Sequence, residues 1–377
     1  MLVLCVQFCF GLSYSTFFLL PKFLARQFRA NADAIGAVAA TALLASVLAS
    51  PWTGAWLDRG SRRPFIVYGA LVNGLCGCAF ALIQAVSWPI FALRVVHGVS
   101  YGLVFNGIVT LATDLAPSRK LGQAIGLCGA ASILSNAIAP ALAESIADQR
   151  GWGMVFLLAG ASAWVAALLS LAIVERKQAP SHAPDADVAG SAAPSALALL
   201  REPERVGAFV CSAANGAAFG AMFTFTQPFA LSLGASKVSG FFLGYTLFAL
   251  MVRLFLGNWA DAWGRRRVAV LALVLYGCVG SLTSLLRPDL LFAAGAGLGL
   301  AHGLLYPSLN ALAAEGVPRA RRGAVMSYFF GCFGAGSALW VLLMGVVAKS
   351  YGYALVFLAT GLLVWCAVAF LPKKAPG

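Results

Sequence analysis

Apolar runs of about 20 residues recur from one end of the chain to the other, and they limit the folds that are open to it. A helix of that length crosses the roughly 30 Å of hydrocarbon in a bilayer, where no water is present to satisfy backbone polar groups. Each run is therefore expected to be a membrane-spanning helix. We predict twelve spans, at residues 2–20, 34–57, 65–86, 88–113, 121–145, 153–174, 206–230, 237–259, 268–286, 290–313, 323–347 and 353–371.

The composition agrees with a protein surrounded by lipid. Of the 377 residues, 61% are hydrophobic and only 10% are charged, whereas soluble domains carry about 25% charged residues. The net charge of +13 could indicate a nucleic-acid partner, but the cations lie in short loops and no soluble domain carries them, so we expect none. Most of the loop cations fall on the side that holds both termini, which the positive-inside rule assigns to the cytoplasm.

The segment 175–203 divides the chain into two similar halves. It is rich in Pro, Ala, Ser and Asp, cannot bury a core and is expected to be a cytoplasmic linker. On either side the halves align without gaps, so that Gly98 matches Gly299 and Gly102 matches Gly303. We therefore predict a duplicated all-α protein with a six-helix bundle at 1–174, the linker at 175–203 and a second six-helix bundle at 204–377.

Two loops at matching places concentrate the charge of the chain. The first reads GAWLDRGSRRP from Gly54 and the second GNWADAWGRRR from Gly257, with Ala262 where the first copy has Arg59. An Asp at the end of a span can pair with arginines and with the positive end of a neighbouring helix. We expect these loops to hold one side of the protein closed, through Gly54, Asp58, Arg59 and Arg62 in the first copy and Gly257, Asp261, Arg265 and Arg266 in the second.

The twelve spans, the repeat and the two loops together resemble the major facilitator superfamily, and the resemblance covers the whole chain. It implies two pseudo-symmetric bundles that expose a central site to each side of the membrane in turn, with the substrate near the midplane between them. It also implies that the two charged loops are gates that open and close.

The fourth span contains a buried charge of the kind that is functional by default. Arg94, His97 and Tyr101 share one helical face, beside a strip of Gly98 and Gly102. An Arg followed by glycines in this span resembles the motif that the family links to proton coupling. The alternative is an arginine neutralised by backbone carbonyls.

The fifth span resembles the antiporter motif of the family in spacing, although Ser and Ala replace three of its glycines. Its Gly126, Ser135 and Pro140 are expected to serve helix packing, together with Gly98 and Gly102 of the fourth span.

The remaining candidates are polar and aromatic side chains within spans. His302 is expected to take part in proton coupling with Arg94 and His97, because His titrates near neutral pH. No Asp or Glu lies in the middle of a predicted span, so the cavity is expected to be aromatic and weakly polar. We expect its substrate-binding residues to be Gln7, Tyr14, Tyr101, Asn136, Asn215, Met222, Arg253, Tyr306 and Tyr328.

These features favour a secondary transporter that exports a small organic molecule in exchange for protons. The alternative is uptake or exchange of an organic anion such as a carboxylate, which Arg94, Arg253 and His302 would suit. A receptor or scaffold on the same fold is a further class, against which the two gating aspartates argue. No nucleophile and base pair, phosphate loop or metal set indicates an enzyme, so we expect no metal and no cofactor. We expect a monomer in a bilayer, in a cell membrane such as the bacterial inner membrane.

The charge distribution makes a testable prediction about topology. A reporter fused after Gly377, or inserted within 175–203, should be active in the cytoplasm, because the positively charged loops are retained there. Fusions to green fluorescent protein, which is fluorescent in the cytoplasm, and to alkaline phosphatase, which is active only outside it, measure this location. An external signal at either position would contradict the orientation.

Overall fold

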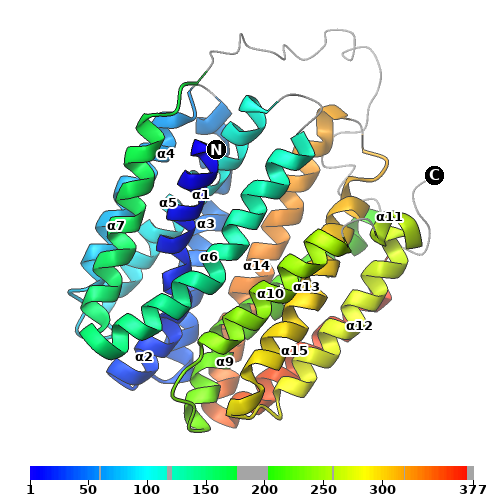
Figure 1. Ribbon diagram of the computed structural model, residues 1–377. Coiled ribbons are helices and arrows are strands. Elements are labelled where there is room, and N and C mark those ends of the chain that lie inside the picture. The colour runs from blue at the N-terminus through cyan, green and yellow to red at the C-terminus, as the bar shows by residue number, and fades with distance from the viewer. Residues whose placement is uncertain (59–60, 117–120, 176–202, 257–258, 318, 372–377) are drawn as a thin grey trace.

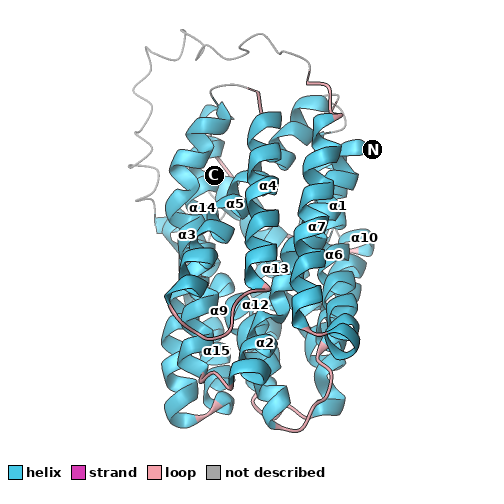
Figure 2. Cartoon of the chain, turned by 90° about the vertical axis from the view of Figure 1, so that its left-hand side faces the viewer, coloured by secondary structure: helices cyan, strands magenta, loops and turns pink. Residues whose placement is uncertain are grey.

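The computed structural model describes residues 1–377 except 59–60, 117–120, 176–202, 257–258, 318 and 372–377. Every regular element in this described part of the chain is helical, and the long helices run alongside one another (Figure 1). The view turned by 90° shows the same elongated bundle (Figure 2). The protein is an all-α polytopic membrane protein, which confirms the prediction made from the apolar runs.

The first span is longer than the predicted 2–20. Helix α1 (Leu2–Thr16) continues through the 3-10 turn η1 (Phe17–Leu19) into α2 (Leu20–Phe28). Pro21 is the second residue of α2, in the first turn, where backbone N–H groups have no partner within the helix. The N–H that proline lacks is therefore not needed there. The helix can therefore resume after the turn, and the apolar stretch extends to Phe28.

The other helices follow the predicted spans with shifts at their ends. In the described chain, 11 helical stretches are long and apolar enough to cross a membrane, and the 17-residue α10 is a shorter twelfth. The third span ends at Phe80 rather than 86, because the chain turns at residues 81–82. The elements are α3 (Ala32–Asp58), α4 (Arg63–Phe80), α5 (Trp88–Leu115), α6 (Leu121–Arg150), α7 (Trp152–Leu171), α9 (Pro203–Ser232), α10 (Ser239–Phe255), α11 (Trp259–Trp263), α12 (Arg265–Thr283), η4 (Pro288–Leu290), α13 (Leu291–Ala314), α14 (Arg319–Tyr351), α15 (Tyr353–Ala367) and η5 (Val368–Phe370).

The same contact occurs at matching places in both sets of six spans. The indole N–H of Trp164 in α7 donates to the carbonyl of Leu71 in α4, at 3.2 Å. Trp365 in α15 donates in the same way to Val274 in α12, at 3.1 Å. Each indole also lies against a glycine of the helix it contacts. This repetition is what a duplication produces, while the domain boundaries at 174 and 204 stay a prediction, since residues 176–202 of the linker lie outside the described part of the chain.

The two sets of helices meet along two seams, α3 against α14 and α6 against α10. At the first seam the backbones approach closely: a Cβ added to Gly36 would lie 2.8 Å from the carbonyl oxygen of Val341. A Cβ added to Gly345 would lie 3.0 Å from the carbonyl oxygen of Ala32. Small residues at these positions therefore let the halves come together.

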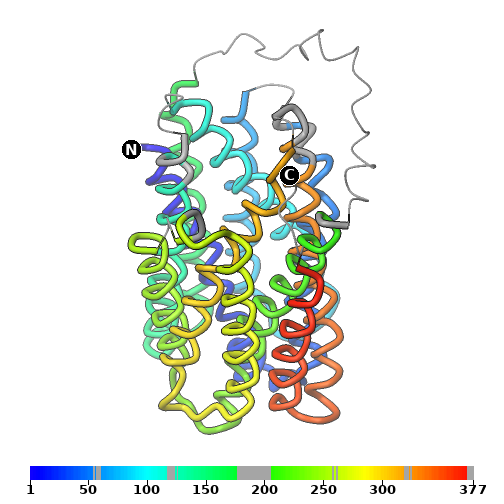
Figure 3. Tube along the Cα trace, turned by 90° about the vertical axis from the view of Figure 1, so that its right-hand side faces the viewer, coloured from blue at the N-terminus to red at the C-terminus, as the bar shows by residue number. Residues whose placement is uncertain are grey.

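We call the end of the bundle at which the chain begins, marked N in Figure 3, the linker end, and the opposite end the distal end. At the distal end, a buried ion pair joins Lys22 of α2 to Glu144 of α6. The same carboxylate accepts hydrogen bonds from the backbone N–H groups of Val238, at 2.8 Å, and Ser239, at 2.9 Å. These two amides begin α10 of the other half, so Glu144 closes the distal end by capping a helix across the seam.

The buried pair makes a prediction about the closed distal end. Replacing Glu144 by Gln leaves the ammonium of Lys22 buried without a counter-charge, which costs on the order of 3 kcal/mol. We expect the distal end to open in a larger share of molecules. Spin labels on Gln149→Cys and Leu285→Cys, in a cysteine-free background, should report a longer distance by pulsed electron resonance.

The matched control is Asp289→Asn, which removes an ion pair with Arg287 that is largely exposed and so contributes little. It should leave the distance distribution unchanged. A Glu144→Gln distribution identical to that of the parent protein would show that the pair does not hold the distal end.

Candidate functional site

Arg94 is buried in the first half, and backbone carbonyls surround its guanidinium. Its Nε donates to the carbonyl of Val38 at 3.1 Å and its Nη2 to that of Ala39 at 3.4 Å, both in α3. The approach depends on Gly98, one turn further along α5, since a Cβ there would overlap the backbone of Ala42. The sequence left open whether Arg94 has backbone partners, and the structure provides them.

His97 is the third partner of Arg94. The two nitrogens, Arg94 Nη1 and His97 Nδ1, lie 3.0 Å apart. Because a guanidinium can only donate, Nδ1 accepts and the hydrogen of the neutral ring lies on Nε2. The Nε2 atom is buried and has no hydrogen-bond partner among the described residues. The site thus joins a fixed cation to a neutral imidazole whose second ring nitrogen has no partner in the described part of the chain.

An aromatic column extends from His97. The ring of Tyr14 in α1 stacks on His97, with centroids 5.4 Å apart, and on Tyr101 at 3.7 Å. Phe17 contacts His97 from another side, at 4.2 Å. Two of the expected substrate-binding residues, Tyr14 and Tyr101, therefore lie together beside the Arg94 site.

The second half has a comparable group around His302. Its Nδ1 lies 3.1 Å from Oδ1 of Asn215 in α9, and since a carbonyl oxygen only accepts, Nδ1 carries the hydrogen. The ring also contacts Phe219, with centroids 4.9 Å apart, and Tyr306, at 5.5 Å. The structure brings three of the candidate residues, His302, Asn215 and Tyr306, into one group.

One signal in the sequence was missed. The pattern His-Gly-x-x-Tyr occurs in both α5 and α13, at His97 and at His302. Gly98 and its counterpart Gly299 both lie against the backbone of a neighbouring helix, so they define the structural match. When Gly98 is aligned with Gly299, the second His-Gly-x-x-Tyr pattern lies one helical turn further along its helix than the first. His302 then occupies the position that Tyr101 has in the first half.

A polar network behind His97 was also missed. Ser13 Oγ donates to Asn73 Oδ1 at 3.2 Å, and Asn73 Nδ2 donates to Ser100 Oγ at the same distance. Ser100 Oγ in turn donates to the carbonyl of His97, at 3.1 Å. The signal was available, since Asn73 is a polar residue within an apolar span and needs partners there.

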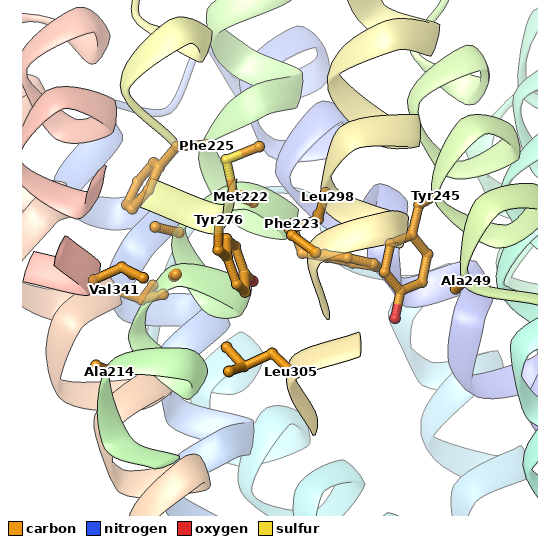
Figure 4. Packing of buried hydrophobic residues seen from close by; sticks show 14 of the residues in the cluster. Ala214, Met222, Phe223, Phe225, Tyr245, Ala249, Tyr276, Leu298, Leu305 and Val341 are labelled. Atoms are coloured by element: carbon orange, nitrogen blue, oxygen red, sulfur yellow. The ribbon is translucent and has the colours of Figure 1, made fainter. Parts of the chain in front are cut away.

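Two of the expected substrate-binding residues form hydrogen bonds between helices. Gln7 donates to Ser132 of α6, and Asn136 of α6 accepts from Ser15, at 2.8 Å. Both bonds connect α1 to α6. Two others lie apart from the groups described above: Met222 is fully buried in the core of the second half (Figure 4), while Tyr328 is about half exposed.

The packing residues expected in α5 and α6 differ in their surroundings. Gly102 lies against the side chain of Ser46, and Ser135 is buried against Gly11 of α1. Pro140 lies inside α6 and is buried. By contrast, a Cβ at Gly126 would meet nothing within 4 Å, so the structure gives that glycine no packing contact.

At the linker end, two equivalent ion pairs involve predicted gating residues. Arg62 Nε lies 3.4 Å from Asp114 Oδ2, and Arg265 Nη1 lies 3.7 Å from Glu315 Oε1. Each pair joins the start of one span to the end of the next span. Arg266 is exposed. The other predicted gating positions, Gly54, Asp58, Arg59, Gly257 and Asp261, lie outside the residues whose side chains the structure describes.

Arg253, the last of the candidates, lines a pocket of about 340 Å³ near the linker end of α10. Tyr306 and Asn310 of α13 contribute the other polar side chains of this pocket. The described residues include no cluster of three or more His, Cys, Asp or Glu that could hold a metal ion.

Comparison with known proteins identifies the fold and the family. The model of the Major Facilitator Superfamily matches residues 3–252 and 238–377. A crystal structure of a mutant of the nucleoside transporter NupG is similar, with a TM-score of 0.78 at 16% sequence identity over 99% of this chain and 100% of that chain. At that identity the likeness concerns the fold alone.

Curated relatives are membrane transporters as well. The multi-drug resistance efflux pump PmrA of Streptococcus pneumoniae serotype 4 is 25% identical over 342 residues, which are 87% of this chain and 83% of that protein. The multidrug resistance protein MdtG of Serratia proteamaculans is 25% identical over 347 residues, 88% of this chain and 83% of that protein. With a family model that matches nearly its whole length, the chain belongs to the Major Facilitator Superfamily and is a membrane transporter, not an enzyme.

Proposed function

We propose that the protein exports a small amphipathic organic compound in exchange for protons. PmrA is named a multi-drug resistance efflux pump and MdtG a multidrug resistance protein, and these names support export of organic compounds. The observation that carries the proposal is the buried contact of 3.0 Å between Arg94 Nη1 and His97 Nδ1. It connects a fixed charge, a titratable ring and an aromatic surface within one half of the protein.

The aromatic groups of both halves suit the proposed substrate. Tyr14 and Tyr101 stack in the first half, and Phe219 and Tyr306 flank His302 in the second. Phe18 connects the halves, since its ring contacts Phe223 with centroids 5.0 Å apart. Aromatic walls with a few polar groups are typical of sites for amphipathic molecules.

Proton uptake and transport would be coupled through the lone pair on Nδ1 of His97, which accepts the hydrogen bond from Arg94. Protonating Nδ1 removes this acceptor and creates a second positive charge beside the guanidinium. Two buried cations in contact repel each other strongly, so the proton could be held only if Arg94 moved away from His97. Since Arg94 also binds the carbonyls of Val38 and Ala39 in α3, its movement would change how α3 and α5 pack.

In the proposed cycle, the conformation with the closed distal end is the one that takes up substrate. With the termini in the cytoplasm, as the charge distribution predicts, the described conformation is closed to the outside by Glu144 and Lys22. It would receive substrate from the cytoplasm, and a proton would reach His97 after the distal end opens. Uptake or exchange of an organic anion stays the alternative to proton-coupled export.

The proposal predicts that His97→Gln separates coupling from transport. Gln keeps a polar side chain near Arg94 but cannot take up a proton, so substrate accumulation driven by a pH gradient should fall at least tenfold. Exchange of labelled for unlabelled substrate, which needs no net proton movement, should persist. Both are measured in proteoliposomes with a fluorescent amphipathic compound chosen from a panel.

A histidine outside the membrane provides the control. His182→Gln, within the predicted linker and outside the described residues, should retain both activities. Gradient-driven accumulation by His97→Gln at the parent rate would contradict the role of His97. Accumulation that ignores the pH gradient in the parent protein itself would overturn proton coupling altogether.

A further inference from the structure

The pocket beside Arg253 has a composition that the proposed export cycle does not explain. It is formed by α10 and α13, has a volume of about 340 Å³, and is lined by Arg253, Tyr306, Pro307, Asn310, Ala311 and Ala314. Its three polar side chains are a guanidinium, a phenol and an amide. Each of them can donate hydrogen bonds, and the lining contains no carboxylate.

None of these donors is used within the described chain. Arg253 forms no ion pair or hydrogen bond there, and the side chains of Tyr306 and Asn310 form no hydrogen bond there either. By contrast, Arg94 has carbonyl partners on α3. A guanidinium near the end of a membrane span is stabilised most by a negatively charged partner. Arg forms its best-matched hydrogen bonds with carboxylates and phosphates.

The position of Arg253 connects this pocket to the other half of the protein. Its guanidinium lies directly over Gly129 of α6: a Cβ added to Gly129 would overlap Nη1, and would lie 3.3 Å from Cζ. A side chain at this position would have to displace the guanidinium. A molecule bound to Arg253 would therefore be held at the seam between α6 and α10, where the two halves move relative to each other during transport.

We propose that this pocket binds the anionic group, a carboxylate or phosphate, of an organic molecule. Arg253 supplies the charge, while Tyr306 and Asn310 supply neutral donors around it. Two sources could provide that chemistry, the acidic group of a transported compound and the headgroup of an anionic lipid. The proposal rests on the proposed function only where it places the pocket on the transport route. Anion binding to the pocket can be measured without any transport.

The first experiment compares matched probes on the purified full-length protein. The protein is placed in phosphatidylcholine nanodiscs, and binding of 2-naphthoate and of the neutral 2-naphthamide is measured by calorimetry. We expect the acid to bind at least tenfold more tightly than the amide, and Arg253→Gln to remove the difference. Gly129→Val, which retains the arginine but pushes its guanidinium aside, should also weaken binding of the acid.

The second experiment tests the lipid source. Native mass spectrometry of protein released from mixed membranes should retain phosphatidylglycerol over phosphatidylcholine, and Arg253→Gln should lose that preference. Arg287→Gln, at an exposed distal loop, is the matched control and should behave like the parent protein in both experiments.

Each combination of results is decisive. A preference for the acid that depends on Arg253 supports the pocket as part of a substrate site, and a preference for phosphatidylglycerol that depends on Arg253 supports it as a lipid site. If Arg253→Gln changes neither preference, the pocket is not an anion site. That outcome leaves proton-coupled transport, measured separately with His97→Gln, unaffected.

Discussion

A charge inside a bilayer must find its partner within the protein, because lipid offers none. The arrangement of the first half follows from this constraint. Arg94 can be buried only because α5 approaches α3 closely enough for two backbone carbonyls to accept from it. That approach requires the bare backbone at Gly98. The glycine and the arginine are therefore one structural unit, and His97 becomes a participant because it completes the set of acceptors.

The two halves share a framework but differ in what it carries. The tryptophans at 164 and 365 make the same contact with the same carbonyl positions. The first half places an arginine beside its histidine, whereas the second places an amide, Asn215, there. Packing constrains the framework strictly, since a glycine that faces a backbone cannot change. The polar groups that face the interior are less constrained, and there the two copies differ.

The sequence predicted the spans well because bilayer thickness imposes a length that composition alone reveals. It also named Tyr14, Tyr101, His302 and Asn215 as candidate site residues, and their roles stay a prediction. It did not predict the ion pair of Lys22 with Glu144, because Lys22 lies just beyond the predicted first span and Glu144 near the end of the fifth, where charges usually face water. Nothing in a linear pattern indicates which distant helix end will bury them. The need of Asn73 for partners could be read from the sequence, but the partners themselves could not, since they lie on other helices.

The contact of Glu144 with α10 has a consequence for how the cycle could be observed. The first turn of that helix receives its capping oxygens from the opposite half, and no side chain of its own replaces them. When the halves separate at the distal end, the amides of Val238 and Ser239 must turn to water. The rate of hydrogen exchange at these two amides would then report how often the distal end opens, and it could be measured in the unmodified protein.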